Sequence, residues 1–191
     1  FLYFFVLYVR KRYLIPLMST LLGVGIVIRY FVMKKHRISI IEKFLKKASR
    51  VGIDGLVIPD LPFEEFYRYK PSFDASCIDN IMLASLTSSE QRWCRISSIG
   101  KGFIYCVSVK GVTGVRDKVS SEVKDFLIKL RRMTELPLAL GFGLSNKKQI
   151  DDIKDYCDGI IIGSKILSML LKADSLEDGL REVESFIVGI N

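Results

Sequence analysis

Two glycine-rich turns near the C-terminal end of the chain have the residue types that best suit anion binding. The first is Gly141–Phe142–Gly143, followed closely by Ser145, and the second is Gly163–Ser164. Glycine lets the backbone approach an anion closely, and successive N–H groups at a helix N-terminus supply partial positive charge. Ser145 and Ser164 are also favourable N-cap residues. The turns predict a phosphate site made largely from backbone.

The same turns have an ordinary structural explanation that has to be weighed. Either turn alone would be explained better as an ordinary loop without a ligand, since glycine occurs in loops of every kind. Both turns, however, follow consecutive apolar runs, and a glycine pair, Gly111 and Gly114, follows the run before them. Three glycine-containing turns at successive strand ends favour the anion site.

Other kinds of chemistry find little support in the composition. The only histidine is His36, so a Ser-His-Asp triad or a multi-histidine metal site would depend on that one residue. The four cysteines form no CxxC pair and have no zinc spacing. We therefore expect no metal, no disulfides and a reducing, cytoplasmic location.

The net charge of +8 is distributed unevenly along the 191 residues. Residues 1–50 hold eleven Lys/Arg and one acid, a balance of +10, whereas the rest holds eighteen Lys/Arg and twenty Asp/Glu, a balance of −2. An evenly basic protein would suggest a nucleic-acid partner. A near-neutral domain behind a basic leader does not, and we expect no nucleic-acid partner.

The leader, residues 1–37, differs in character from residues 38–191. Leu14–Met33 is a mostly apolar stretch of twenty residues, the length of a membrane span, but it contains Pro16 and Arg29. Three interpretations stay open: a membrane anchor, a damaged or wrongly translated remnant of a barrel's missing part, or an apolar core segment. We favour the remnant and expect no membrane partner.

From residue 38 onward, short apolar runs alternate with longer amphipathic stretches. The runs are typical of strands buried on both faces, and the stretches have apolar residues at three- and four-residue spacing. The expected strands are Gly55–Pro59, Ile81–Ala84, Phe103–Ser108, Pro137–Gly141 and Asp158–Gly163, and the expected helices are Ile41–Val51, Ser120–Met133 and Asn146–Tyr156.

This alternation of strands and helices predicts an α/β fold with a parallel sheet, either doubly wound or a (β/α)8 barrel. The glycines decide between them, because the last two strand-end loops of a barrel commonly form a phosphate site with a short helix. A dinucleotide site is disfavoured because no GxGxxG follows the first strand. We predict a barrel.

Five segments carry a recognisable pattern in order along the chain: Ile41–Glu65, Leu86–Ser97, Gly102–Arg116, Pro137–Ile150 and Asp158–Leu167. Together they resemble one family, the alpha subunit of tryptophan synthase. The resemblance covers residues 38–191 and implies about strands 4–8 of a (β/α)8 TIM barrel, the first strands being missing or replaced by the leader. The chain is thus similar to an N-terminally incomplete or degraded member.

The resemblance also implies an activity and a set of site residues. The family is a lyase that cleaves indole-3-glycerol phosphate to indole and glyceraldehyde 3-phosphate in tryptophan biosynthesis, without metal or cofactor, beside a beta subunit in an alpha-beta heterotetramer. The implied residues for the phosphate ester are Tyr105, Thr113, Gly114, Phe142, Gly143, Gly163 and Ser164, and those facing the partner are Asp60 and Pro62.

One departure from the family bears on the chemistry. Its acid/base carboxylates belong to a segment resembling ELGxPFSDPxADGP, and no such segment occurs in this sequence. Cleavage needs two positioned carboxylates, and we expect none of the nearby acids to replace them. Those acids are Asp54, Asp60, Glu64 and Glu65. Two hypotheses remain: an alpha-chain enzyme recorded incompletely, and an inactive relic that binds phosphate or the beta subunit.

Overall fold

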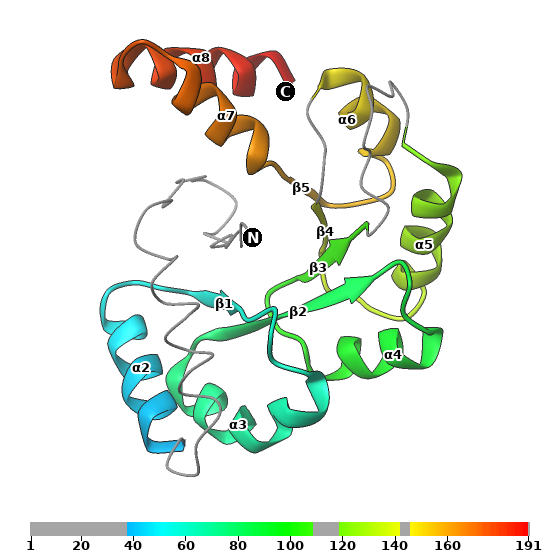
Figure 1. Cartoon of the computed structure of the whole chain (residues 1–191). Helices are drawn as coiled ribbons and strands as arrows, with labels where there is room; N and C mark the ends of the chain where they lie inside the picture. The colour runs from blue at the N-terminus through cyan, green and yellow to red at the C-terminus, as the bar shows by residue number, and fades with distance from the viewer. Residues whose placement is uncertain (1–37, 109–118, 142–145, 191) are drawn as a thin grey trace. The chain divides into compact units, whose positions relative to one another are not determined.

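The computed structural model describes residues 38–108, 119–141 and 146–190 (Figure 1). The chain divides into two compact units. Within the described residues, the first unit comprises 38–83 and 99–103, and the second comprises the remainder. The leader, residues 1–37, lies outside the described residues.

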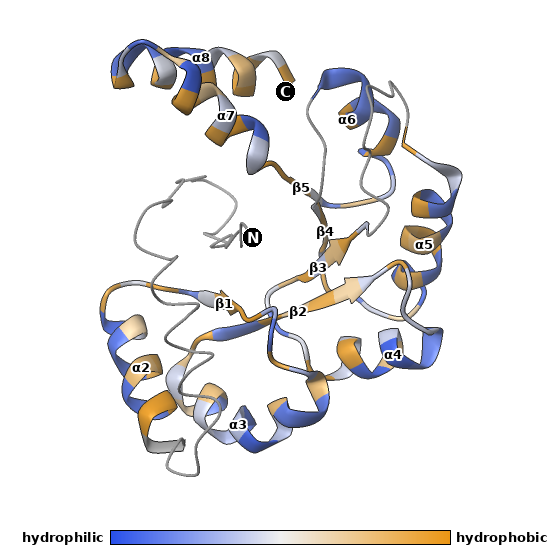
Figure 2. Ribbon diagram, in the orientation of Figure 1, coloured by the Kyte–Doolittle hydropathy of each residue, from blue (hydrophilic) through white to orange (hydrophobic). Residues whose placement is uncertain are grey.

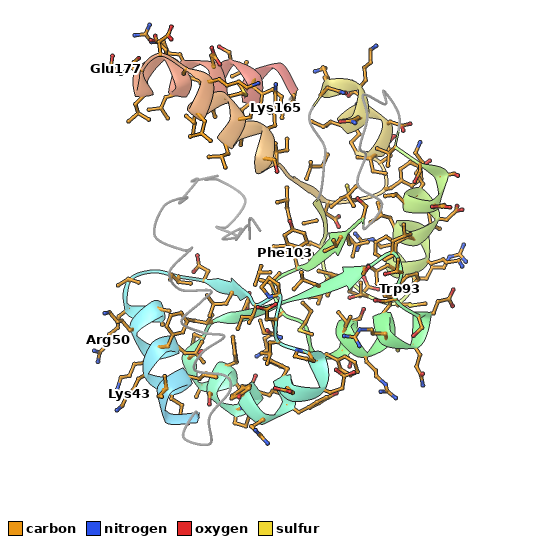
Figure 3. All side chains as sticks on the ribbon, viewed as in Figure 1. Lys43, Arg50, Trp93, Phe103, Lys165 and Glu177 are labelled. Carbon is orange, nitrogen blue, oxygen red and sulfur yellow. The ribbon has the colours of Figure 1, made fainter. Side chains whose placement is uncertain are left out.

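In the first unit, two helices alternate with two parallel strands. The elements are α2 (Ile38–Arg50), β1 (Gly55–Val57), α3 (Phe63–Ser76) and most of β2 (Asp79–Ser85). β1 pairs with β2 in parallel, with Gly55 opposite Asp79 and Val57 opposite Ile81. In α2, Lys43 and Arg50 extend outward (Figure 3), whereas Leu45 is buried. The amphipathic pattern expected for Ile41–Val51 is confirmed.

Gly102, which follows α4 (Glu90–Ile99), packs closely against β2. Gly102 has a φ of +73°, and a Cβ there would lie 2.8 Å from Ile81 Cδ1 and 2.9 Å from Asp79 Oδ2. The N–H of the preceding residue, Lys101, donates to Asn80 O at 3.0 Å. Both the backbone conformation and the lack of space require glycine at this position.

The second unit continues the alternation through the rest of the chain. Its elements are α4 (Glu90–Ile99), β3 (Ile104–Val107), α5 (Ser121–Arg131), β4 (Leu138–Gly141), α6 (Lys147–Ile153), β5 (Gly159–Ile161), α7 (Ser164–Lys172) and α8 (Leu176–Ile190). β3 pairs with β4 and β4 with β5, both in parallel. In Figure 2, β3 and β4 are hydrophobic, while α4 and α5 mix polar and apolar residues.

The core of the second unit forms where helices cover the strands. Trp93 of α4 packs against Phe126 of α5 with ring centroids 4.9 Å apart (Figure 3). The indole N–H of Trp93 donates to Ser85 O at 2.9 Å, which satisfies the one polar atom of a buried side chain. Leu127 and Leu130 are fully buried on the same face of α5. Figure 3 shows Trp93 directed toward α5.

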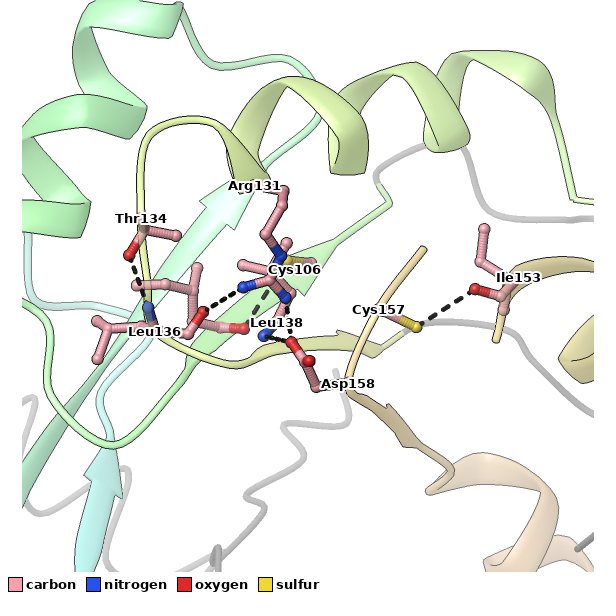
Figure 4. A network of polar contacts seen from close by, with 9 residues as sticks. Cys106, Arg131, Thr134, Leu136, Leu138, Ile153, Cys157 and Asp158 are labelled. Carbon is pink, nitrogen blue, oxygen red and sulfur yellow. Dashed lines mark hydrogen bonds and ion pairs between the residues drawn. The ribbon is translucent and has the colours of Figure 1, made fainter. Parts of the chain in front are cut away.

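A polar network joins the N-terminal ends of β4 and β5 (Figure 4). The Asp158 carboxylate accepts from the Leu138 N–H at 2.7 Å and forms an ion pair with Arg131, and the Asp158 N–H donates to Leu138 O at 2.8 Å. Arg131 Nη1 also donates to Leu136 O at 3.1 Å. The end of α5 is therefore joined to the starts of two strands.

The predicted strands and helices are largely confirmed. All five expected strands are present, with ends that differ from the expected ones by at most two residues, and every described pair is parallel, as expected for part of a barrel. The helices expected over Ser120–Met133 and Asn146–Tyr156 are present but shorter, as α5 and α6. Among the described residues, no helix is both long and apolar enough to cross a bilayer. The four cysteines are all unpaired thiols.

Candidate functional site

The C-terminal ends of β3, β4 and β5 lie at one edge of the second unit. The register places Val107 opposite Gly141, and Gly141 opposite Ile161. Because these strands are parallel and adjacent, the residues that follow them emerge on the same side. Gly163 and Ser164 come two and three residues after Ile161. The edge expected to carry the phosphate site is thus formed by three neighbouring strands.

Tyr105 and Gly141 meet at this edge. A Cβ built on Gly141 would lie 2.6 Å from both Cε1 and Cζ of Tyr105. No real Cβ tolerates such a contact, so the phenol ring occupies the space that any other residue would need at position 141. Burial raises the pKa of the Tyr105 phenol, which keeps it a neutral hydrogen-bonding group. The sequence indicated both residues but gave no sign that they touch.

Gly163 and Ser164 begin α7, and no side chain among the described residues caps this helix. Gly163 is the N-cap residue and Ser164 the first helical residue, so the expectation of Ser164 as N-cap is off by one position. The Leu167 N–H bonds to Gly163 O at 3.0 Å, which leaves the N–H groups of the first turn ahead of it without a helical acceptor. Ser164 is exposed, and the first turn contains no acid.

The start of α8 differs from that of α7 in each of these respects. Ser175 Oγ accepts from the Asp178 N–H at 3.2 Å and donates to the Asp178 carboxylate at 2.6 Å. Glu177 and Asp178 both lie in its first turn. Here the positive end of the helix dipole is already compensated by the protein. At α7, no side chain of the described residues compensates it, and Lys165 lies in the first turn (Figure 3).

The first glycine turn leads into α6. Asn146 is the N-cap residue, and its side chain accepts from the Gln149 N–H at 2.9 Å. Ser145 was the expected N-cap, so this expectation is wrong by one residue. Asparagine and serine cap about equally well, and the sequence offers both in succession.

Several predicted site residues lie outside the described residues. These are Thr113, Gly114, Phe142 and Gly143. Their expected roles therefore remain predictions.

The predicted partner-facing residues lie in the first unit. Asp60 and Pro62 are both exposed, in the turn that connects β1 to α3. The Leu61 N–H closes this turn by bonding to Ile58 O at 3.2 Å, and Pro62, with φ −59°, is the residue before the first helical turn. Their exposure leaves both side chains accessible to another protein.

Carboxylates are not found at the described strand ends of the second unit. Tyr105–Ser108, Leu138–Gly141 and Gly159–Ser164 contain no Asp or Glu. The nearest acid in sequence, Asp158, stands at the opposite, N-terminal end of β5. Within the described part of the chain, no group of three or more His, Cys, Asp or Glu could hold a metal ion. The described strand ends therefore offer backbone N–H groups and no carboxylate.

The sequence matches a known protein family over most of its length. The family model described as "Tryptophan synthase alpha chain" matches residues 26–190. The tryptophan synthase alpha chain of Carboxydothermus hydrogenoformans is 45% identical over 130 residues, which are 68% of this chain and 49% of that one. That of Dictyoglomus thermophilum is 40% identical over 158 residues, 83% of this chain and 61% of that one. The chain thus spans between about half and three-fifths of the length of these relatives.

Solved structures show the same fold. A tryptophan synthase a2b2 complex from Pyrococcus furiosus contains a chain that superimposes with a TM-score of 0.73 at 23% identity, covering 78% of this chain and 60% of that one. A structure from Aquifex aeolicus gives a TM-score of 0.67 at 25% identity, covering 78% and 54%. These likenesses confirm the predicted fold, the later strands of a (β/α)8 barrel.

Proposed function

The chain belongs to the tryptophan synthase alpha chain family, and on this premise we propose that it binds indole-3-glycerol phosphate by its phosphate group. In the complete family protein, this binding would serve the aldol cleavage that yields indole and glyceraldehyde 3-phosphate in tryptophan biosynthesis. The proposed contacts come from Tyr105, Thr113, Gly114, Phe142, Gly143, Gly163 and Ser164.

One observation carries the proposal most directly: the uncapped, acid-free start of α7. It follows β5, whose end is level with Gly141, and a phosphate there would accept from first-turn N–H groups and gain from the helix dipole. α8, in the same unit, compensates its own N-terminus with Ser175, Glu177 and Asp178. An open helix start at the expected edge of the sheet therefore supports anion binding there.

The cleavage step itself needs two carboxylates that this sequence does not offer in the family's pattern. No segment resembling ELGxPFSDPxADGP occurs in it, and the described strand ends of the second unit hold no acid. We therefore propose that the chain by itself binds substrate without cleaving it. A second candidate, favoured by the same observation, is a relic that keeps the phosphate site and the exposed Asp60 and Pro62 for a beta-subunit-like partner.

Location, cofactors and partner follow from family membership as further parts of the proposal. We propose a cytoplasmic protein that uses no cofactor or metal and associates with a tryptophan synthase beta subunit. The unpaired state of all four cysteines supports a reducing compartment. The exposure of Asp60 and Pro62 supports a contact on that side of the first unit.

Calorimetric titration of chain 1–191 with indole-3-glycerol phosphate tests the binding site. We expect saturable binding that inorganic phosphate displaces, because most of the recognition is assigned to the phosphate group. A Ser164→Asp variant should bind more weakly, since its carboxylate would occupy the start of α7. The matched control is Ser175→Asp, which adds the same charge at the start of α8 and should leave binding unchanged. Equal affinity in all three proteins would refute the proposed site.

An indole-release assay separates binding from cleavage. The chain alone should release no indole above the uncatalysed background. Turnover would show that carboxylates outside the family pattern perform the acid/base steps. Adding a purified beta subunit should alter the titration if Asp60 and Pro62 face that partner, and Asp60→Lys should abolish the change.

A further inference from the structure

Four basic side chains lie along one face of α2. They are Lys43, Lys46, Lys47 and Arg50, and all four are exposed. Because each residue turns an α-helix by about 100°, the four fall within an arc of about 100° and extend over about 10 Å of the helix. Figure 3 shows Lys43 and Arg50 extending from the outer side of α2. We call these four residues the basic stripe of α2.

The opposite face of α2 is buried in the first unit. Leu45 and Ala48 on this face have exposed fractions of 1% and 4%, and α2 packs against α3. The only acid of α2, Glu42, accepts from Ser72 Oγ of α3 at 3.5 Å, so its carboxylate lies toward α3. Packing therefore fixes the orientation of the helix and keeps the basic stripe on the surface.

The carboxylates of the described residues do not neutralise the basic stripe. None of them forms an ion pair or a hydrogen bond with any of its four side chains. Other lysines of the first unit are paired: Lys70 and Lys101 both bind the Asp74 carboxylate, at 2.6 and 2.7 Å. The charge of the stripe is therefore available to an external anion.

The positive charge of the first unit is concentrated on this one helix. The described residues of the unit, 38–83 and 99–103, hold seven Lys/Arg and seven Asp/Glu, a balance of zero. On α2, four basic residues stand against one acid. The pairs Lys43 with Lys47 and Lys46 with Arg50 are spaced i, i+4, where like charges destabilise a helix. An anionic partner would relieve this repulsion.

Two apolar side chains at the ends of α2 favour a lipid surface over a nucleic acid as that partner. Ile40, in the first turn, is 38% exposed, and Val51, directly after the last helical residue, is 68% exposed. Apolar groups next to lysine and arginine suit the headgroup region of a bilayer, where the former enter the interface and the latter meet phosphates. None of the exposed side chains described on α2 is aromatic, as base stacking would need.

We propose that the basic stripe of α2 binds the surface of a membrane that contains anionic phospholipids. The contact is peripheral, because the apolar face of α2 is packed within the first unit and only the exposed side chains reach the lipid. It involves no membrane span and is separate from the anchor considered for the leader. It is also independent of the proposed phosphate site, whose residues belong to the second unit.

Co-sedimentation of chain 1–191 with lipid vesicles tests the proposal. Vesicles of phosphatidylcholine and phosphatidylglycerol in equal parts should bind the chain, and vesicles of phosphatidylcholine alone should not. Each basic residue near an anionic surface raises the partition coefficient about fivefold, so Lys43→Gln combined with Lys47→Gln should lower it about 25-fold. Raising the salt concentration from about 0.1 M to about 1 M shortens the Debye length from about 10 Å to about 3 Å and should release the chain.

A double variant of the second unit provides the matched control. Lys129 and Lys172 are exposed on α5 and α7, so Lys129→Gln combined with Lys172→Gln removes the same net charge from the chain. Its binding to the anionic vesicles should equal that of the unmodified chain. The comparison also separates the basic stripe from the basic leader, which all three proteins share. Circular dichroism checks that all three are folded, and glutamine is a good helix former at an exposed position.

Equal binding by the stripe variant and the control variant would overturn the proposal, because the leader or the overall charge would then explain the adsorption. A failure of the unmodified chain to bind anionic vesicles would overturn it as well, and binding of a DNA duplex in their place would assign the stripe to a different class of partner. The affinity for glycerol 3-phosphate should be the same with and without the stripe substitutions. A failed lipid contact can therefore be told apart from a failed phosphate site.

Discussion

The two ends of the strands in the second unit are built in opposite ways. At the N-terminal ends, side chains form hydrogen bonds with the backbone. The Asp158 carboxylate accepts from the Leu138 N–H, and Arg131 forms an ion pair with Asp158 and donates to the Leu136 carbonyl. At the C-terminal ends, glycine at 141 leaves space for Tyr105, and the start of α7 has no side-chain cap. The first end is closed by side chains of the protein itself, and the second is where we propose that a phosphate group binds. The proposed function therefore assigns stability and binding to opposite ends of the strands of one sheet.

The largest expected effect comes from filling the space at the C-terminal edge. Gly141→Val should destabilise the fold by about 3 kcal/mol, because the new side chain would overlap the Tyr105 ring, and should abolish phosphate-ester binding. Urea denaturation and calorimetric titration measure the two losses. Gly141→Val combined with Tyr105→Ala should recover part of the stability. A double variant no more stable than the single one would contradict the contact.

Removing the Asp158 carboxylate at the N-terminal ends of the strands should cost less stability and should leave binding unchanged. Asp158→Ala leaves the Leu138 N–H without its acceptor and should cost about 1–2 kcal/mol of unfolding free energy. Binding of glycerol 3-phosphate by the folded protein should not change. The exposed Asp174 offers a control, since Asp174→Ala should alter neither quantity. A loss of affinity in Asp158→Ala that matched its loss of stability would show that the edges are not independent.

A charge at the start of α7 should move stability and binding in opposite directions. Ser164→Asp should stabilise the fold by about 0.5 kcal/mol through the helix dipole and weaken phosphate binding about tenfold through repulsion. Thermal denaturation and titration of one preparation test both signs. Raising the salt concentration should reduce both effects, because the new charge is exposed. Changes of the same sign would contradict the open helix start.

The last prediction concerns pH and the buried thiol of Cys106 in β3. Burial raises the pKa of Cys106, so the folded state holds its proton where the unfolded state has lost it. A raised folded pKa means that stability falls as pH rises above the ordinary thiol value of 9.0. Between pH 8 and pH 9.5 this loss should be about 1 kcal/mol for Cys106. Cys106→Ala should flatten that part of the curve, and an unchanged slope would contradict it.

The strands could be predicted because their signal is local. Phe103–Ser108 and Pro137–Gly141 are continuous apolar runs, and both contain the observed strands β3 and β4. The helix start at Ser164 followed from the Gly163–Ser164 turn, with an error of one residue. These features depend on neighbouring residues alone.

Features that depend on contacts between distant residues could not be predicted. Tyr105 and Gly141 are 36 positions apart, and nothing near either residue reveals that they touch. The hydrogen bond from the Val119 N–H to Asp152 likewise joins residues 33 positions apart, and no local pattern indicates it.

One helix also departed from a local rule. α3 contains Pro71, although proline lacks the N–H that an interior position would use. Pro71 and Tyr67, the residue one turn earlier, are both exposed, so the carbonyl left without a helical donor is on the solvent side. Local propensity alone would have ended this helix too early.

The cysteines allow the chain to be labelled without mutation. Cys77 is exposed in the first unit and Cys94 is exposed in the second, whereas Cys106 is buried and Cys157 half-buried. Maleimide dyes at near-neutral pH should therefore attach to the first two thiols and spare the others. A donor and an acceptor placed there would report the separation of the two units by energy transfer in single molecules, with and without a phosphate ester.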